Sequence, residues 1–155
     1  MDLILWRHAE AQEALPGGDD LARALTPRGE LEALQMGAWL DRRLAASARV
    51  LVSPALRCEQ TALALGRTYR SMPVLAPGGT VEQLLAAAQW PDAHAPVVVV
   101  GHQPSLGQTL AQLLGFAQGS CPVRKGALWW LRTRERQGRV QVVVVSVQTP
   151  DLLRG

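Results

Sequence analysis

Four valines in a row, Val97–Val100, run directly into Gly101 and His102. An unbroken run of β-branched residues is typical of a strand that is buried on both faces of a sheet, since a half-exposed strand would alternate apolar and polar residues. Leu3–Trp6 and Val50–Val52 have the same character. We therefore expect an α/β fold, in which a largely parallel sheet is covered by helices on both faces.

The segments between these strands carry signals for helices. Thr26 followed by Pro27 predicts a helix start, because threonine caps a helix and proline suits its first position. Ser53 followed by Pro54 predicts a second start of the same kind. Apolar residues that lie four apart give the first of these helices its buried stripe, which consists of Met36, Leu40 and Leu44.

The middle of the chain continues the alternation of strand and helix. Pro73–Leu75 predicts a short, weaker strand, and a Pro-Gly-Gly turn separates it from a helix that includes residues 81–85. Residues 106–114 place four leucines on one helical face, and Gly115 is the expected C-cap.

Two more strands are expected near the end, at Leu128–Leu131 and Val142–Val145. The charged turn around Gln137 and Gly138 favours an antiparallel hairpin, so the largely parallel sheet becomes a mixed one. The chain has 155 residues, of which 48% are hydrophobic and 19% charged. These values exclude a disordered, collagen-like or coiled-coil protein and predict one domain over residues 1–155, with a core that needs no metal or disulfide.

Charge and cysteine content narrow the expected partners and compartment. The net charge is +3, but no run of like charges or interleaved aromatic residues occurs, so nucleic-acid binding is disfavoured. Cys58 and Cys121 form no C-x-x-C motif, which fits a reducing compartment. The apolar run at the start is too short for a signal peptide, and no stretch approaches the roughly 20 apolar residues of a membrane span. We expect a cytoplasmic protein without a membrane partner.

The residues that follow the predicted strands suggest where the chemistry lies. Ligands of open α/β sheets bind beyond the carboxyl ends of the strands. Arg7 and His8 follow the first strand, Arg57 follows the second, and His102 follows the valine strand. Two helix starts lie at the same edge, and free N–H groups at helix starts favour anions. Two imidazoles, two guanidinium groups and two helix starts together predict a phosphate pocket.

Other kinds of site are less consistent with the sequence. Ser53 and Ser105 each lie beside a proline at a predicted helix start, so capping explains them better than nucleophilic catalysis. No cluster of metal ligands and no phosphate-binding G-x-x-x-x-G-K-[ST] loop occurs. The positive charge of Arg57 lies in the first turn of its predicted helix, where the helix dipole is also positive. It therefore requires a compensating partner.

Four motifs occur in order along the chain: Leu5–Ala9 (LWRHA), Leu25–Gly29 (LTPRG), Ser53–Ala62 (SPALRCEQTA) and Val100–Leu106 (VGHQPSL). With these motifs the chain resembles the histidine phosphatase superfamily, and it is most similar to the small bacterial phosphohistidine phosphatases of the SixA type. The resemblance runs from about Asp2 to about Leu114 and is one of general topology beyond Gly115. It implies a three-layer α/β/α sandwich, a phosphoryl-histidine intermediate, and no metal or organic cofactor.

The resemblance also implies roles for single residues. His8 matches the nucleophile of the family's R-H-G motif, Arg7 and Arg57 match the two phosphate-clamping arginines, and His102 matches the second histidine. The chemistry is consistent with these roles. A histidine nucleophile must be neutral to attack phosphorus, and neighbouring guanidinium groups disfavour the protonated ring. The same groups stabilise the oxygens of a phosphoryl group in transfer.

Two departures from the family pattern matter. Ala9 replaces the glycine of the R-H-G motif; we expect its N–H to remain available and its methyl group to be tolerated. Glu82 is the only carboxylate in the stretch where larger relatives place a general acid, although a solvated helix residue explains it equally well. Asp19 and Asp20, on a Pro-Gly-Gly loop, are weaker candidates for an acid or for lid contacts.

Three functions remain open at the level of sequence. A short chain has little material to close over a small metabolite, so an open pocket that accepts a phosphorylated protein side chain is favoured, and a phosphoglycerate mutase is disfavoured. We therefore expect a phosphohistidine phosphatase whose partner is a phosphorylated protein. A small-molecule phosphomonoesterase and a non-catalytic phosphate-binding module are the alternatives.

Overall fold

The computed structural model describes residues 1–154, which contain a single mixed sheet. Its strands are β1 (Asp2–Arg7), β2 (Arg49–Val52), β3 (Arg70–Ser71), β4 (Val97–Gly101), β5 (Leu128–Arg136) and β6 (Arg139–Gln148). They lie in the order β3-β2-β4-β1-β5-β6. The first four in this order are parallel, whereas β5 runs antiparallel to both β1 and β6. The expectation of a largely parallel but mixed sheet is confirmed.

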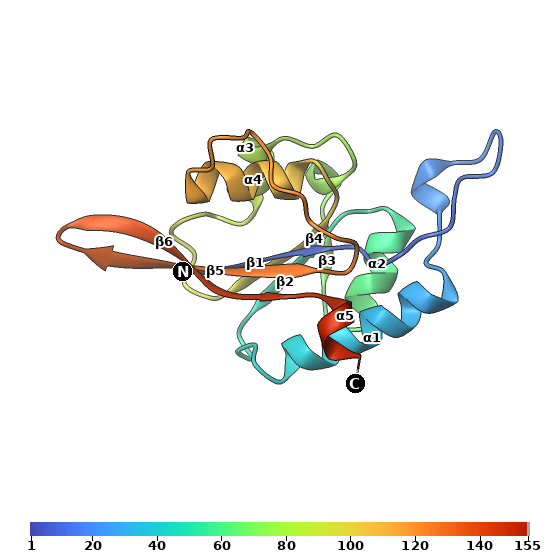
Figure 1. The fold of residues 1–155 in the computed structure, drawn as a ribbon, viewed down its shortest axis with the longest axis horizontal. Coiled ribbons are helices and arrows are strands. Elements are labelled where there is room, and N and C mark those ends of the chain that lie inside the picture. Colours follow the sequence, from blue (N-terminus) through green and yellow to red (C-terminus); the bar gives the residue numbers. More distant parts are fainter. Residues whose placement is uncertain (155) are drawn as a thin grey trace.

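Helices cover both faces of this sheet. They are α1 (Pro27–Asp41), α2 (Leu56–Leu63), α3 (Val81–Ala87), α4 (Ser105–Leu114) and α5 (Pro150–Leu153), with 3-10 turns η1 (Asp20–Ala22) and η2 (Pro73–Leu75). In Figure 1, α3 and α4 lie above the sheet and α1, α2 and α5 lie below it, which gives the three-layer α/β/α arrangement. No helix in residues 1–154 has the length and apolar character needed to cross a lipid bilayer.

The core is divided between the two faces by the alternation of side chains along β1. Ile4 and Trp6 point to the layer of α1 and α2, where they join Met36. Leu3 and Leu5 point to the layer of α3 and α4. All of these side chains are at least 99% buried. At about 25 cal/mol per Å² of apolar surface, each contributes on the order of 2 kcal/mol to folding, so β1 is fixed firmly enough to position the residues that follow it.

Several predicted helix ends are confirmed. Thr26 is the N-cap of α1, where its hydroxyl accepts a hydrogen bond from the Gly29 N–H, and Pro27 is the first helical residue. Gly115 is the C-cap of α4, with a left-handed φ of 72° that glycine adopts without strain. The stripe of α1 is also buried, although Leu44 lies just beyond the helix end.

Other local predictions were wrong. Helix α2 begins at Leu56 rather than after Ser53, and its N-cap, Ala55, makes no side-chain bond. Ser105 does not cap α4; its hydroxyl donates to the carbonyl oxygen of His102. Pro73–Leu75 forms the 3-10 turn η2, and the strand precedes it as β3, whose two exposed polar residues leave no apolar pattern in the sequence.

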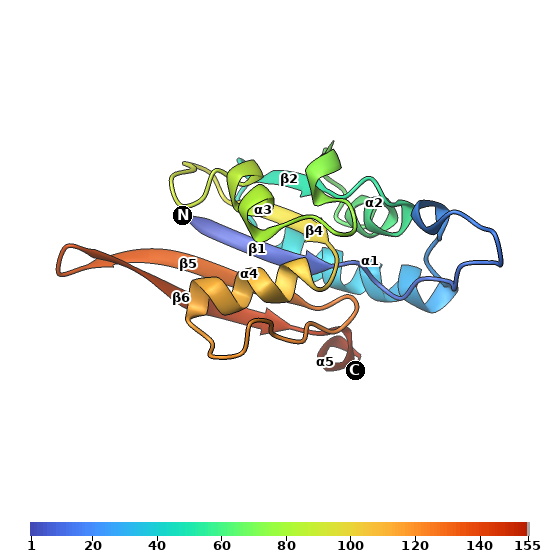
Figure 2. The ribbon, with the colours of Figure 1, turned by 90° about the horizontal axis from the view of Figure 1, so that it is seen from above.

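The antiparallel hairpin of β5 and β6 is longer than the sequence suggested. The strands have 9 and 10 residues, and their outer ends carry charged side chains that hide the strand pattern. Gln137 and Gly138 form the turn with φ angles of 52° and 73°, as expected for a tight two-residue hairpin loop. Figure 2 shows the tip of the hairpin extending beyond the helical layers.

Candidate active site

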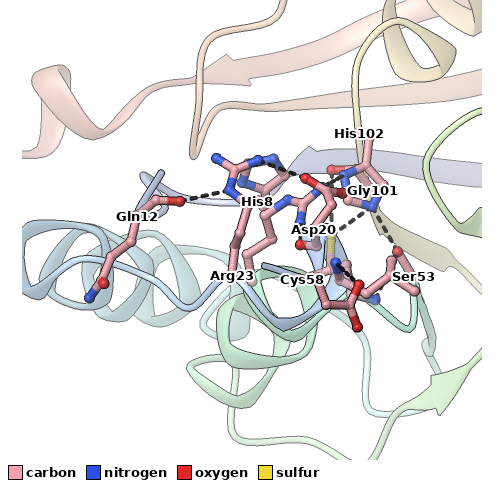
Figure 3. Close-up of polar contacts among 12 residues, drawn as sticks. His8, Gln12, Asp20, Arg23, Ser53, Cys58, Gly101 and His102 are labelled. Atoms are coloured by element: carbon pink, nitrogen blue, oxygen red, sulfur yellow. Dashed lines mark hydrogen bonds and ion pairs between the residues drawn. The ribbon is translucent and has the colours of Figure 1, made fainter. Parts of the chain in front are cut away.

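The two histidines predicted for the site lie close together, where neighbouring strands end (Figure 3). β1 and β4 are parallel neighbours with Arg7 opposite Gly101, so His8 and His102 leave the sheet side by side. Their ring centroids are 5.4 Å apart. Arg57 approaches from the first turn of α2, and its Nη2 lies 3.5 Å from Nδ1 of His102. The carboxyl edge of the sheet thus brings together two imidazoles and two guanidinium groups.

His8 is held as a neutral imidazole with one free ring nitrogen. Its Nδ1 lies 2.7 Å from the carbonyl oxygen of Ala9, and because a carbonyl only accepts, Nδ1 carries the proton. Nε2 therefore presents a lone pair. The ring is 5% exposed, and burial lowers the pKa of His8 to about 3, with nearby His102, Arg57 and Arg7 acting in the same direction. At neutral pH the ring has the form that a nucleophile needs.

Arg57 is buried, and an exposed loop provides its partner. We call residues 12–24 the flap; an isolated bridge between Ala11 and Leu25 closes its base, and it extends from the body at the upper right of Figure 1. Nη1 of Arg57 donates to the Asp20 carbonyl oxygen at 2.8 Å, and Nη2 donates to Asp20 Oδ2 at 3.1 Å. The flap thus supplies the compensating partner that the helix dipole requires.

The other Asp20 oxygen binds a second arginine. Arg23 donates through Nη1 to Asp20 Oδ1 at 3.1 Å and through Nε to the Gln12 carbonyl oxygen at 2.7 Å. Hydrogen bonds from Arg23 and then from Arg57 lower the pKa of Asp20, so its side chain is a carboxylate at neutral pH. A carboxylate and a third guanidinium group therefore stand at the edge of the pocket.

Each arginine of the pocket has a buried donor that no described residue accepts. Arg7 donates through Nη1 to the Val123 carbonyl oxygen at 2.7 Å. Within residues 1–154, the buried Nε atoms of Arg7 and Arg57 have no hydrogen-bond acceptor. Buried charged donors normally bind an acceptor, and guanidinium groups bind phosphate oxygens strongly. The donor set fits a bound oxyanion.

His102 is anchored through the nitrogen that faces the interior. Its Nε2 lies 2.7 Å from Ser53 Oγ and 3.5 Å from Cys58 Sγ. Burial lowers the pKa of His102 to about 4, and the charge of Arg57 adds to this effect. Burial also raises the pKa of the Cys58 thiol to about 12, which leaves it unreactive at neutral pH.

Comparisons with known proteins agree with this geometry. The model of the histidine phosphatase superfamily (branch 1) matches residues 3–78. The phosphohistidine phosphatase SixA of Escherichia coli (strain K12) is 36% identical over 121 residues, which cover 73% of this chain and 74% of that protein. The chain belongs to the histidine phosphatase superfamily.

Solved structures of histidine phosphatases have the same fold over nearly the whole chain. A putative phosphohistidine phosphatase SixA from Nakamurella multipartitia is 31% identical, with a TM-score of 0.79 and coverage of 96% of this chain and 95% of that one. A protein histidine phosphatase SixA complexed with tungstate is 29% identical, with a TM-score of 0.77 and coverage of 99% and 100%. The three-layer fold is thus the histidine phosphatase fold.

Two residues that the sequence singled out have other surroundings than expected. Glu82 is exposed in the first turn of α3, and in the described chain it has no hydrogen bond or ion pair with the pocket residues. Ala9 is fully buried and its N–H donates to Thr61 Oγ1 at 3.1 Å, so the expectation that this N–H stays available to a ligand was wrong. Its methyl group packs with Leu25 and Ala33 and is accommodated.

Three residues around the pocket have roles that the sequence did not predict. Arg23 follows no strand, and its one signal is the Asp20–Arg23 spacing of three, which is typical of an ion pair within one helical turn. Asp20 was expected only as an acid or lid residue, while Asp19 caps η1 through the Leu21 N–H. Ser53 was expected to be a cap, but it contacts the His102 ring.

Residues 1–154 contain no group of three His, Cys, Asp or Glu side chains that could hold a metal ion.

Proposed function

We propose that this protein is a phosphatase that hydrolyses phosphohistidine on protein substrates, with the phosphoryl group held transiently on Nε2 of His8. One observation carries the proposal: a neutral, buried His8 with a free Nε2 lies within reach of the charges of two guanidinium groups, whose buried Nε donors have no acceptor within residues 1–154. A nucleophile beside oxyanion donors is the arrangement that phosphoryl transfer requires. The related SixA structure binds tungstate, a tetrahedral oxyanion that is similar to phosphate in shape and charge.

In the first step, Nε2 of His8 attacks phosphorus, and the bond from phosphorus to the substrate's ring nitrogen breaks. When the other nitrogen of the substrate ring carries a proton, the ring leaves as neutral imidazole. The reaction then needs no acid from the enzyme, which agrees with the exposed position of Glu82 and with its lack of contacts to the described pocket residues. Arg7 and Arg57 bind the phosphoryl oxygens, where charge develops in the transition state.

In the second step, water attacks the phosphorus of phospho-His8. The bond between phosphorus and Nε2 breaks, its electron pair returns to the ring, and both water protons stay with the released phosphate. His8 retains its Nδ1–H throughout, because the Ala9 carbonyl oxygen accepts it at 2.7 Å. That proton makes the ring a cation while it is phosphorylated, and a cationic ring is a better leaving group than a neutral one.

The shape of the site supports a protein substrate. The flap contacts the pocket through Asp20 and extends away from the body (Figure 1). Because most of its described residues are exposed, few of its contacts would enclose a small metabolite. A phosphohistidine on another protein brings its own surface to the rim.

A substrate comparison tests the function. We expect kcat/KM for a phosphohistidine-containing protein to exceed the values for sugar phosphates and phosphotyrosine peptides by at least tenfold, with and without a chelator. A preference for a soluble sugar phosphate would favour a small-molecule phosphomonoesterase. Binding of inorganic phosphate without turnover of any of these substrates would favour a non-catalytic phosphate-binding module.

A further inference from the structure

Ser53 lies on the interior side of His102. It follows β2, is fully buried, and its Oγ lies 2.7 Å from Nε2 of the ring. The other ring nitrogen, Nδ1, lies 3.5 Å from Nη2 of Arg57. The two nitrogens of His102 therefore have different surroundings, one within the protein interior and one beside the phosphate-binding guanidinium group (Figure 3).

These contacts define which nitrogen of His102 carries the proton. Guanidinium groups only donate, so Nδ1 accepts from Arg57 and the neutral ring carries its proton on Nε2. Nε2–H then donates to Ser53 Oγ. The Ala55 N–H also donates to this oxygen, at 3.2 Å, so both of its lone pairs are in use and its orientation is fixed. The bond made by one ring nitrogen sets the state of the other.

A bound phosphoryl group changes what Nδ1 must do. Phosphoryl oxygens are acceptors, so the Nδ1 lone pair repels them unless Nδ1 gains a proton. We propose that Ser53 is a positioning residue that keeps Nε2–H of His102 in the interior, so that Nδ1 faces the phosphoryl group and becomes a donor to it. The proton comes from the O–H of a monoanionic phosphoryl group, which becomes a dianion, or from water, which leaves hydroxide in the solvent. This inference rests on the proposed function, because a phosphoryl group is the ligand that Nδ1 faces.

The charges around His102 determine when this protonation occurs. The groups that face the ring come from three places: Arg57 and Cys58 from α2, Asp20 and Arg23 from the flap, and Arg7 and His8 from the end of β1. Without a ligand, burial keeps the ring neutral, and the charges of Arg57, Arg7 and Arg23 add to this effect while that of Asp20 opposes it. A bound phosphoryl dianion adds negative charge beside the ring and favours its protonation. The acceptor at Ser53 then stabilises the doubly protonated ring.

Ser53→Ala removes the acceptor. We expect kcat to fall by roughly 10- to 100-fold, the effect that loss of the outer hydrogen-bond partner has on metal-binding histidines. Because His102 must be protonated in the complex, the basic limb of the kcat–pH profile should move to lower pH. Ser53→Thr retains the hydroxyl and should restore the wild-type profile. If Ser53→Ala does not fold, Ser53→Cys, whose thiol is a weak acceptor, should give the same shift.

Ser105→Ala is a matched control, because the Ser105 hydroxyl contacts the His102 carbonyl oxygen at 3.1 Å but not the ring. It should leave the pH profile unchanged. Nitrogen NMR of the His102 ring gives a readout that does not depend on turnover. Wild-type protein should show Nε2–H alone, and added inorganic phosphate should protonate Nδ1. In Ser53→Ala the tautomers should mix, and protonation with phosphate should require a lower pH.

An unchanged pH limb together with an unchanged His102 tautomer in Ser53→Ala would overturn the proposal. A general loss of stability with neither change would overturn it as well, because Ser53 would then be a merely structural serine. If phosphohistidine is not hydrolysed by the wild-type protein, the proposed function fails. The NMR comparison with inorganic phosphate then still decides the role of Ser53.

Discussion

At the scale of single residues, hydrogen bonds in the pocket determine which ring nitrogen of each histidine carries a proton. The carbonyl oxygen of Ala9 fixes Nδ1–H of His8, and the Ser53 hydroxyl oxygen fixes Nε2–H of His102. Arg7 and Arg57 stay charged at any physiological pH. Burial and the neighbouring cations both disfavour a protonated imidazole, so His8 stays a neutral nucleophile at neutral pH.

The nucleophile is tested directly. We expect one phosphoryl group on His8 when a reaction with a phosphohistidine protein is stopped without acid and analysed by mass spectrometry. His8→Ala should abolish turnover, because no other described residue offers a free nitrogen lone pair beside both guanidinium groups. His94→Ala, which changes a histidine outside the pocket, is the control. Full activity in His8→Ala would exclude the mechanism.

The second clamp is tested with a charge-conserving change. Arg57→Lys keeps the positive charge but loses the planar guanidinium group. That group contacts Asp20 through both Nη atoms and leaves Nε free to donate to a ligand. We expect kcat/KM to fall by about 100- to 1,000-fold, as for loss of an oriented transition-state donor. Arg28→Lys, at an exposed arginine on α1, should be neutral. Near-normal kinetics in Arg57→Lys would make Arg57 a structural residue.

At the scale of elements, the flap and α2 form one unit through Asp20 and Arg57. The Asp20 carboxylate lies 3.1 Å from the same Nη2 that approaches His102. A phosphoryl group that binds Arg57 therefore meets a negative charge on the flap. Arg23 offsets this charge, because it binds the other oxygen of Asp20.

Removal of that charge should strengthen phosphate binding. In Asp20→Asn we expect the Kd for inorganic phosphate to fall by roughly three- to tenfold, as about 1 kcal/mol is typical of one charge near the surface. Isothermal titration at low salt measures the change. Asp19→Asn, which changes the neighbouring carboxylate that caps η1, should have little effect. Weaker phosphate binding in Asp20→Asn would show that Asp20 acts by orienting Arg57.

The elements also show why sequence patterns located some parts of the site and not others. Arg7, His8 and His102 could be placed because they lie at the ends of strands whose apolar runs are unmistakable, and parallel strands end at one edge. The flap has no periodic pattern, so the contact between Asp20 and Arg57, 37 positions apart, leaves no local signal. Ser53 illustrates a different failure, since a serine before a proline suggests a cap in any context.

At the scale of the whole molecule, burial of the two active-site histidines makes the stability of the fold depend on pH. His8 and His102 are 5% and 4% exposed, and burial lowers the pKa of His8 to about 3 and that of His102 to about 4. The ordinary value in an unfolded chain is about 6.5. Below that pH the two histidine rings bind protons in the unfolded chain but stay neutral in the folded protein, so acid favours unfolding.

The stability of the protein should therefore depend on pH between about 7 and 3. The contribution from both histidines is fully present above pH 6.5 and is lost as the pH falls toward their folded-state values. At pH 5 the loss is about 2 kcal/mol for each histidine, because the unfolded chain is then mostly protonated and the folded protein is not. Urea unfolding at pH 7.5 and pH 5 measures it. His8→Gln should roughly halve the loss, whereas His94→Gln, at a position outside the core, should leave it unchanged. If wild-type protein and His8→Gln lose equal stability between these pH values, the buried ring of His8 is not the source of the acid sensitivity.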